Sequence, residues 1–300
     1  MQIFITPRDR IDVSGVLLMV MLTFLWGCNY SAIKFASAGI SPVFMAFLRS
    51  AIASLLGIVY CAAIKEPLFH RDIRLWHGFM VGLLFGIEFA CIYFGLRYTH
   101  AARAGILINL SPFVVVIGAC LFLQERLNAL KITGLCLAFA GAGCVILWGK
   151  PATWTPAMLF GDAREIIAAV LWGATTIYIK KYLAGRVQPI HTFLYQLVFS
   201  IPILLLCAYV LEPTWIHRID GPILAALGYQ SVIVAFASYL AWFKLIHTYP
   251  VSQLAVFSFL TPIFGVASGA VFLGEPVTAG LVIGMSLVCA GIYVNNSGQR

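Results

Sequence analysis

Long runs of apolar residues without charges constrain this chain more than any other feature. From Val13 to Ile33, 21 consecutive residues carry no charged side chain. The hydrocarbon core of a membrane is about 30 Å thick, and a helix needs roughly 20 residues to cross it. Ten runs of about this length follow one another, at residues 13–35, 42–64, 76–98, 102–123, 129–149, 163–182, 190–211, 222–245, 252–273 and 277–295. The sequence therefore predicts an all-α membrane protein with ten transmembrane helices.

The composition excludes a soluble protein of this length. Hydrophobic residues make up 62% of the chain and charged residues 10%, against about 45–50% and about 25% in soluble domains. The net charge of +8 would suggest nucleic acid in a soluble protein, but here the basic residues lie in short connections between apolar runs. We therefore expect the lipid bilayer to be the partner of this chain, and no nucleic acid.

The basic residues are distributed unequally between the two sides of the predicted bundle. With the N-terminus inside, twelve lysines and arginines fall on the cytoplasmic side and six on the far side, and Arg49 lies within a span. Loops that stay in the cytoplasm carry an excess of lysine and arginine. The distribution therefore predicts that both termini are cytoplasmic.

The second half of the chain repeats features of the first. Trp26-Gly27 is followed by Lys34, and Trp172-Gly173 by Lys180, with the same spacing. Aligned without a gap, residues 112–141 and 262–291 share 10 identities in 30 positions, where this composition gives roughly 2 or 3 by chance. The aligned stretches include Glu125 and Glu275 at the ends of two spans, where helix capping, loop pairing and gating are all open interpretations.

Each copy of the repeat contains five predicted spans, so the second copy enters the membrane from the opposite side. We expect a first five-helix repeat at residues 1–149, a linker at 150–161 and a second five-helix repeat at 162–300. Inverted repeats give a protein two nearly equivalent states, each open to one side, with a binding site near the bilayer midplane. This architecture is typical of secondary carriers.

Several motifs resemble those of EamA-type proteins in the drug/metabolite transporter superfamily. They are Trp26-Gly27-Cys28-Asn29-Tyr30 with Ile33-Lys34, Phe47-Leu48-Arg49, Phe94-Gly95-Leu96-Arg97-Tyr98-Thr99, Ala101-Ala102-Arg103-Ala104, and the stretch from Pro112 to Glu125. The resemblance covers nearly the whole chain. It implies a ten-helix carrier of a bacterial-type inner membrane that exports amino acids, their derivatives, other metabolites or toxic compounds. The second half departs from the first by carrying Gln196 where the first has Arg49.

Two ionisable residues, Arg49 and Glu88, lie well inside the predicted spans. A charge at the bilayer centre costs about 2.5–3.5 kcal/mol on insertion scales, so each side chain should face the protein interior or a wet cavity. Their depths are similar, which leaves two interpretations open. The residues form a structural ion pair, or they act in transport, either by binding the carboxylate and ammonium groups of a zwitterionic substrate or by proton exchange at Glu88.

Polar and aromatic residues at helical spacing predict the rest of a substrate site. Trp26, Tyr30 and Lys34 recur every four residues and share one helix face, as do Trp172, Thr176 and Lys180. Interfacial anchoring is the alternative role for such residues. The predicted substrate-binding residues are Trp26, Asn29, Tyr30, Arg49, Glu88, Tyr93, Trp172, Thr176, Gln196, Tyr239 and Trp242, with Asn109, Tyr229 and Gln230 as further candidates.

A mainly aromatic cavity with a few polar groups suits medium-sized, partly apolar solutes. We expect amino acids or related compounds; organic cations are the alternative, because they stack on aromatic faces. The chain has no phosphate-binding loop, no zinc-protease motif and no nucleophile elbow, and its cysteines and histidines are scattered. We therefore expect a gradient-driven exporter, monomeric or weakly dimeric, without catalytic residues, metal or cofactor. A non-transporting sensor or an enzyme acting on lipids is the more distant alternative.

Overall fold

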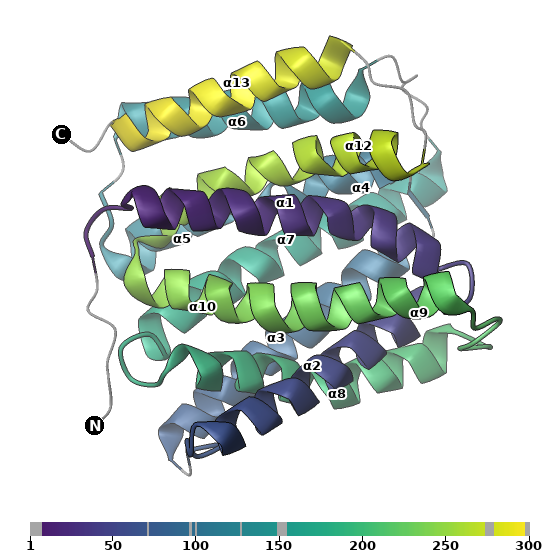
Figure 1. The fold of residues 1–300 in the computed structure, drawn as a ribbon. Helices are drawn as coiled ribbons and strands as arrows, with labels where there is room; N and C mark the ends of the chain where they lie inside the picture. Colours follow the sequence, from purple (N-terminus) through teal and green to yellow (C-terminus); the bar gives the residue numbers. More distant parts are fainter. Residues whose placement is uncertain are drawn as a thin grey trace.

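The protein is a bundle of long helices that lie side by side (Figure 1). The computed structural model describes residues 8–70, 72–95, 98–99, 101–126, 128–148, 155–273 and 279–297, without the side chains of 101–103 and 273. Within these residues the regular structure is helical, apart from an isolated bridge between Ile40 and Ile216. The prediction of an all-α protein is confirmed.

The helices follow the predicted order of the apolar runs. In the first half they are α1 (Val13–Ala36), α2 (Pro42–Ala63), α3 (Ile73–Gly95), α4 (Ala101–Ile108), α5 (Ser111–Leu123) and α6 (Ala129–Leu147). In the second half they are α7 (Pro156–Tyr182), α8 (Pro189–Leu211), α9 (Gly221–Gly228), the π-helix η1 (Tyr229–Ser238), α10 (Tyr239–Thr248), α11 (Val251–Ala255), the 3-10 helix η2 (Val256–Phe259), α12 (Leu260–Leu273) and α13 (Ala279–Ser297).

Nine helical segments of the described chain are long and apolar enough to cross a membrane. Helix α7 is not among them because it carries Asp162, Arg164, Glu165, Lys180 and Lys181. It begins at Pro156, where the Thr155 hydroxyl caps its first turn, and not at residue 163 as predicted. Residues 155–161 of the expected linker are therefore the N-cap and first turns of a helix, whereas residues 150–154, Leu96, Arg97 and Glu275 lie outside the described residues.

Two prolines explain why the fourth and ninth predicted spans are interrupted. A proline ring in a helix clashes with the carbonyl group four residues earlier, which is that of Ile108 for Pro112 and that of Ser258 for Pro262. Helix α4 ends at Ile108, and the 3-10 helix η2 contains Ser258. The same break therefore occurs at corresponding positions of the two halves.

Helices α6 and α13 pack against each other in opposite directions through glycines (Figure 1). A Cβ on Gly134 would lie 2.5 Å from the carbonyl oxygen of Gly291, and a Cβ on Gly141 would lie 2.7 Å from that of Gly284. Such distances leave no room for a side chain, so the backbones touch. The contact pairs an early residue of α6 with a late residue of α13, which makes the two helices antiparallel.

Helices α3 and α8 run in the same direction and pack through a row of glycines on α3. Gly78, Gly82 and Gly86 face Tyr195, Phe199 and Ile203, respectively, so the contact advances along both helices together. The row occupies one face of α3 and leaves Glu88 on another. This packing directs Glu88 toward the centre of the bundle, where the principal cavity lies.

Candidate functional site

A cavity of about 560 Å³ lies in the middle of the bundle. Its walls come from both halves of the chain, with α1, α2, α3 and α4 from the first half and α7, α8, η1, α10 and α12 from the second. All the residues predicted to bind substrate line this cavity: Trp26, Asn29, Tyr30, Arg49, Glu88, Tyr93, Trp172, Thr176, Gln196, Tyr239 and Trp242. The structure brings these residues together, and their binding of a substrate stays a prediction.

Arg49 is buried, with 2% of its surface exposed, and is held by aromatic side chains. Its Nη2 donates a hydrogen bond to the Tyr239 hydroxyl over 2.6 Å, and the guanidinium lies 4.7 Å from the centre of the Phe89 ring. Its Nε is buried without a hydrogen-bond partner. Because a guanidinium is always charged and has five N–H donors, this group retains donors for an anionic ligand.

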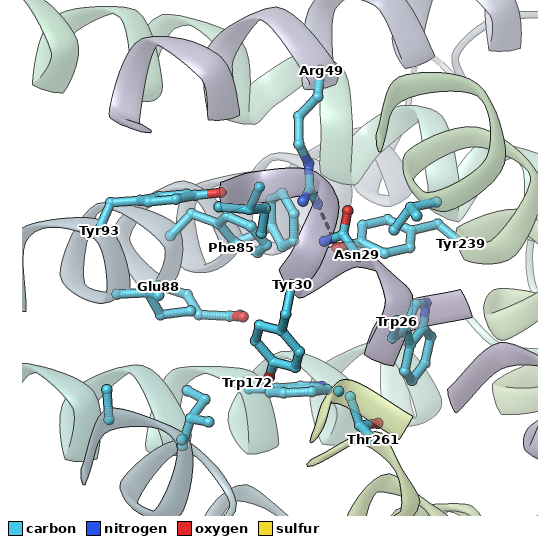
Figure 2. Close-up of a pocket in the computed structure, with 18 of the residues that line it drawn as sticks. Trp26, Asn29, Tyr30, Arg49, Phe85, Glu88, Tyr93, Trp172, Tyr239 and Thr261 are labelled. Atoms are coloured by element: carbon cyan, nitrogen blue, oxygen red, sulfur yellow. Dashed lines mark hydrogen bonds between the residues drawn. The ribbon is translucent and has the colours of Figure 1, made fainter. Parts of the chain in front are cut away.

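Glu88 approaches the cavity from α3, and its carboxylate points across the cavity toward Tyr30 (Figure 2). Among the residues that the structure describes, no ion pair joins Glu88 to Arg49 and no hydrogen bond engages the Glu88 carboxylate. Of the two interpretations left open by the sequence, the structural ion pair does not form in this structure. The cavity therefore contains a guanidinium and a carboxyl group that are not paired with each other.

The aromatic part of the cavity is formed by tryptophans from both halves. Trp26 and Trp242 meet edge to face, with ring centres 5.7 Å apart, and the Trp26 Nε1 donates a hydrogen bond to the Ser238 hydroxyl over 2.9 Å. Ser238 ends the π-helix η1, and Tyr239 follows it directly. π-Helices are rare and often lie at functional sites; this one orients Trp26 and Tyr239 together.

The repeated lysines differ in position. Lys34 lines the cavity with Trp26 and Tyr30, as the stripe predicts. Lys180 does not line it, because its Nζ donates hydrogen bonds to the carbonyl oxygens of Ile246 and Tyr249 over 2.7 and 2.8 Å. The further candidates Asn109, Tyr229 and Gln230 are also not among the lining residues.

One acidic residue of the cavity, Glu165, was not predicted from the sequence. It is 1% exposed and its Oε1 has no hydrogen-bond partner. The predicted sixth span began at residue 163 and placed Glu165 near its end, whereas α7 begins at Pro156 and places Glu165 two turns inside the helix. The capping sequence Thr155-Pro156 was the signal that could have revealed this start, since proline is favoured in a first helical turn.

The described residues contain no group of three or more His, Cys, Asp or Glu side chains arranged to hold a metal ion. The polar groups on the cavity wall include one guanidinium, the Lys34 ammonium, carboxyl groups, amides and hydroxyls, among many aromatic rings. Such a set can bind a small organic solute by its charged ends and its apolar body.

Comparison with known proteins agrees with this geometry. The sequence pattern of the EamA-like transporter family matches residues 13–147 and again residues 159–297. The chain belongs to the EamA-like transporter family. The resemblance to EamA-type proteins of the drug/metabolite transporter superfamily is thereby confirmed, and the protein is a membrane transporter.

Relatives of this EamA-like protein include named efflux pumps. An uncharacterized transporter of Bacillus subtilis, YvbV, is 27% identical, over 98% of this chain and 94% of its own length. Probable amino-acid metabolite efflux pumps of Escherichia coli and Salmonella typhimurium are 26% and 28% identical, over 95% and 94% of this chain and 95% of each pump.

The fold of this EamA-like protein also occurs in a crystal structure of 20% sequence identity. The two superpose with a TM-score of 0.83, over 95% of this chain and 96% of the other. At this identity the match supports the fold.

Proposed function

We propose that this protein is a secondary active carrier that exports amino acids or related metabolites by alternating access. The observation that carries the proposal is the separation of Arg49 from Glu88 in one cavity, with the Arg49 Nε unpartnered. A guanidinium binds a carboxylate with two parallel hydrogen bonds, and a carboxylate binds an ammonium group. In this proposal Arg49 binds the substrate carboxylate and Glu88 its ammonium, and Glu88 exchanges a proton when the substrate has left.

We further propose ten transmembrane helices in two inverted repeats, at residues 1–149 and 162–300. Helix α7 supplies the tenth span, since its charged residues lie near its two ends or face the cavity. The crosswise contacts of Gly134 with Gly291 and of Gly141 with Gly284 support the inversion. In the repeat alignment Gly134 corresponds to Gly284 and Gly141 to Gly291. A two-fold axis in the membrane plane, which relates two antiparallel helices, therefore converts the Gly134–Gly291 contact into the Gly284–Gly141 contact.

The proposal includes the location and assembly predicted from the sequence: a bacterial-type inner membrane, both termini in the cytoplasm, and a monomer or weak homodimer. The amino-acid metabolite efflux pumps among the relatives support the substrate class. Organic cations are the second candidate, favoured by the aromatic rings of Trp26, Trp172 and Trp242 on the cavity wall. Arg49, which forms no ion pair with Glu88, argues against organic cations as substrates, because its positive charge repels a cation.

Ligand binding to the purified protein tests the substrate class. Large amino acids, the corresponding amines without the carboxylate, and N-acetylated derivatives without the ammonium are compared by the increase in melting temperature that each causes. The proposal predicts stabilisation by amino acids and a much weaker effect of both truncated series. Stabilisation by the amines alone would favour the organic-cation function.

A further inference from the structure

A dense set of contacts surrounds the corner between α10 and α11, residues 246–252. The corner lies at the end of the bundle where α1 begins and α7 ends (Figure 1). By contrast, the residues of α1 that line the cavity, from Trp26 to Lys34, lie in the other half of that helix. The corner therefore lies beyond the cavity, on the side of the membrane that the N-terminus faces.

Glu125, which follows the end of α5, binds this corner with both carboxylate oxygens. Its Oε1 accepts a hydrogen bond from the backbone N–H of Val251 over 3.0 Å, and its Oε2 accepts one from the Ser252 hydroxyl. Pro250 precedes α11 and supplies no side-chain cap, so Glu125 satisfies a first-turn N–H that has no partner within its own helix. Gln124, at φ 59°, turns the chain after α5 and makes this approach possible.

Lys180 from α7 binds the other end of the same corner. Its hydrogen bonds to the carbonyl oxygens of Ile246 and Tyr249 occupy acceptors at the end of α10, where a cation is favoured. The start of the chain adds a third attachment, because the Tyr249 hydroxyl donates to Asp12 Oδ1 over 2.7 Å. Of these attachments, those of Glu125 and Asp12 connect the first half of the chain to the second.

A second, much smaller cavity of about 10 Å³ lies between the main cavity and the corner. Trp172, Thr176 and Trp242 line both cavities, and Val251 lines the small one. A cavity needs about 10–15 Å³ of such volume to hold one water molecule, so no solute passes here in this structure. The small cavity therefore shares the two tryptophans with the main cavity and shares Val251, which Glu125 binds, with the corner.

We propose that the Glu125 carboxylate is a gating residue that keeps the transport pathway closed on the N-terminal side. Release of Val251 and Ser252 by Glu125 frees the start of α11, while Lys180 and Asp12 still hold the end of α10, and joins the small cavity to the main one and to the aqueous phase. The inference rests on the proposed function, since it assigns one step of the alternating-access cycle. It also gives a defined role to a residue whose capping, pairing and gating functions were all open from the sequence.

The test is the accessibility of a cysteine at position 255, which lines the small cavity and is 4% exposed as alanine. The substitution Ala255→Cys is made in a chain whose native cysteines are replaced by alanine, and a membrane-impermeant maleimide is applied to the face that the N-terminus occupies. We expect Glu125→Gln to raise the labelling rate by about tenfold, which corresponds to about 1.4 kcal/mol, because an amide loses the charge and offers only one acceptor oxygen.

Glu212→Gln is the matched control. The Glu212 carboxylate also accepts two hydrogen bonds at the start of a helix, in its case from the backbone N–H groups of Val43 and Phe44 of α2, each over 2.9 Å. It lies at the opposite end of the bundle, so this variant should lose a comparable cap without faster labelling. If Glu125→Gln does not fold, Ser252→Ala removes one of the two hydrogen bonds and should raise the rate by about fivefold.

Labelling that is equally slow in the parent, Glu125→Gln and Ser252→Ala proteins would overturn the gate. An equal acceleration by Glu212→Gln would overturn it as well, because general loosening would then explain the effect. The labelling is measured without substrate, so the two proposals fail differently. Unchanged labelling with saturable flux overturns the gate alone, whereas faster labelling without flux of any solute overturns the carrier function alone.

Discussion

The Arg49 Nη2 donates a hydrogen bond of 2.6 Å to the Tyr239 hydroxyl, which connects α2 of the first half to α10 of the second. The bond fixes the guanidinium at the cavity wall without neutralising its charge. Figure 2 shows Arg49 and Glu88 entering the cavity from different walls. Tyr239 therefore keeps the cationic end of the site oriented while leaving its charge available to an anionic substrate.

Replacing Arg49 should weaken the binding of substrates that carry a carboxylate. Hydrogen bonds to charged groups contribute about 1.5–3 kcal/mol, so Arg49→Gln should raise KM by about 10- to 150-fold. Arg49→Lys should recover little, because an ammonium lacks the planar pair of donors. Transport of an amino acid and of its amide, measured side by side, checks this; an equal loss for both would show that Arg49 does not bind the carboxylate.

Tyr239→Phe should act through Arg49. The variant keeps the ring and removes one acceptor of a hydrogen bond, so it should raise KM by about fivefold with little change in kcat. In the Arg49→Gln background the same substitution should have almost no further effect, since the group that it orients is gone. Additive effects of the two substitutions on KM would contradict this positioning role.

Glu88→Gln should separate exchange from proton-driven transport. The amide cannot bind and release a proton, so accumulation driven by a pH gradient should fall to background while counterflow of substrate persists. Glu66→Gln is a control outside the cavity, since Glu66 accepts a hydrogen bond from Gln188 in a connecting segment. A Glu88→Gln protein with normal rate and unchanged pH dependence would exclude Glu88 as the proton-exchanging residue.

The contact of α6 with α13 should tolerate no side chain at Gly284. A Cβ there would lie 2.3 Å from the Val145 side chain and 2.5 Å from the Gly141 carbonyl oxygen, and overpacking of this kind costs about 1–3 kcal/mol. Gly284→Ala should therefore lower the melting temperature. Gly143→Ala in the same helix pair has open space around it and should be neutral or stabilising by up to about 1 kcal/mol; equal melting temperatures of the two variants would refute the close packing.

His70, in the connection before α3, should make stability depend on pH. Burial, and then the nearby positive charges of His191 and Arg74, lower the pKa of His70 below its ordinary value. Below a pH of about 6.5 the unfolded chain therefore binds more protons than the folded one. The contribution of neutral His70 to the free energy of unfolding is therefore present above that pH and is lost as the pH falls. Melting curves between pH 8 and 5 should fall less steeply for His70→Gln; identical slopes would contradict the assignment.

The sequence predicted the apolar helices well and the interrupted ones poorly. Helices α1, α2 and α8 begin and end within one residue of the predicted spans, because apolar runs without charges have few alternative placements. The start of α7 was missed, since the prolines at 151 and 156 and the charge of Asp162 resemble a connection when burial is unknown. The breaks before Pro112 and Pro262 follow from proline geometry and could have been predicted.

The composition of the site could be predicted because helical spacing placed Trp26, Tyr30 and Lys34 on one face. The hydrogen bonds and ion pairs between these side chains could not be predicted, because they depend on the depth and rotation of separate helices. Arg49 binds Tyr239, which directly follows the π-helix η1, and does not pair with Glu88. Lys180 does not line the cavity with Trp172 and Thr176 because its long side chain reaches carbonyl groups at the end of α10.

The most direct test of the carrier function is counterflow in liposomes that contain the purified protein. Labelled amino acids and organic cations are supplied outside vesicles loaded with unlabelled solute, with and without an imposed pH gradient, and the Arg49→Gln protein serves as the control with weakened substrate binding. The proposal predicts saturable counterflow of amino acids that responds to the gradient and has a KM about 10- to 150-fold higher in the variant. Absence of flux for every solute in a broad panel would contradict it.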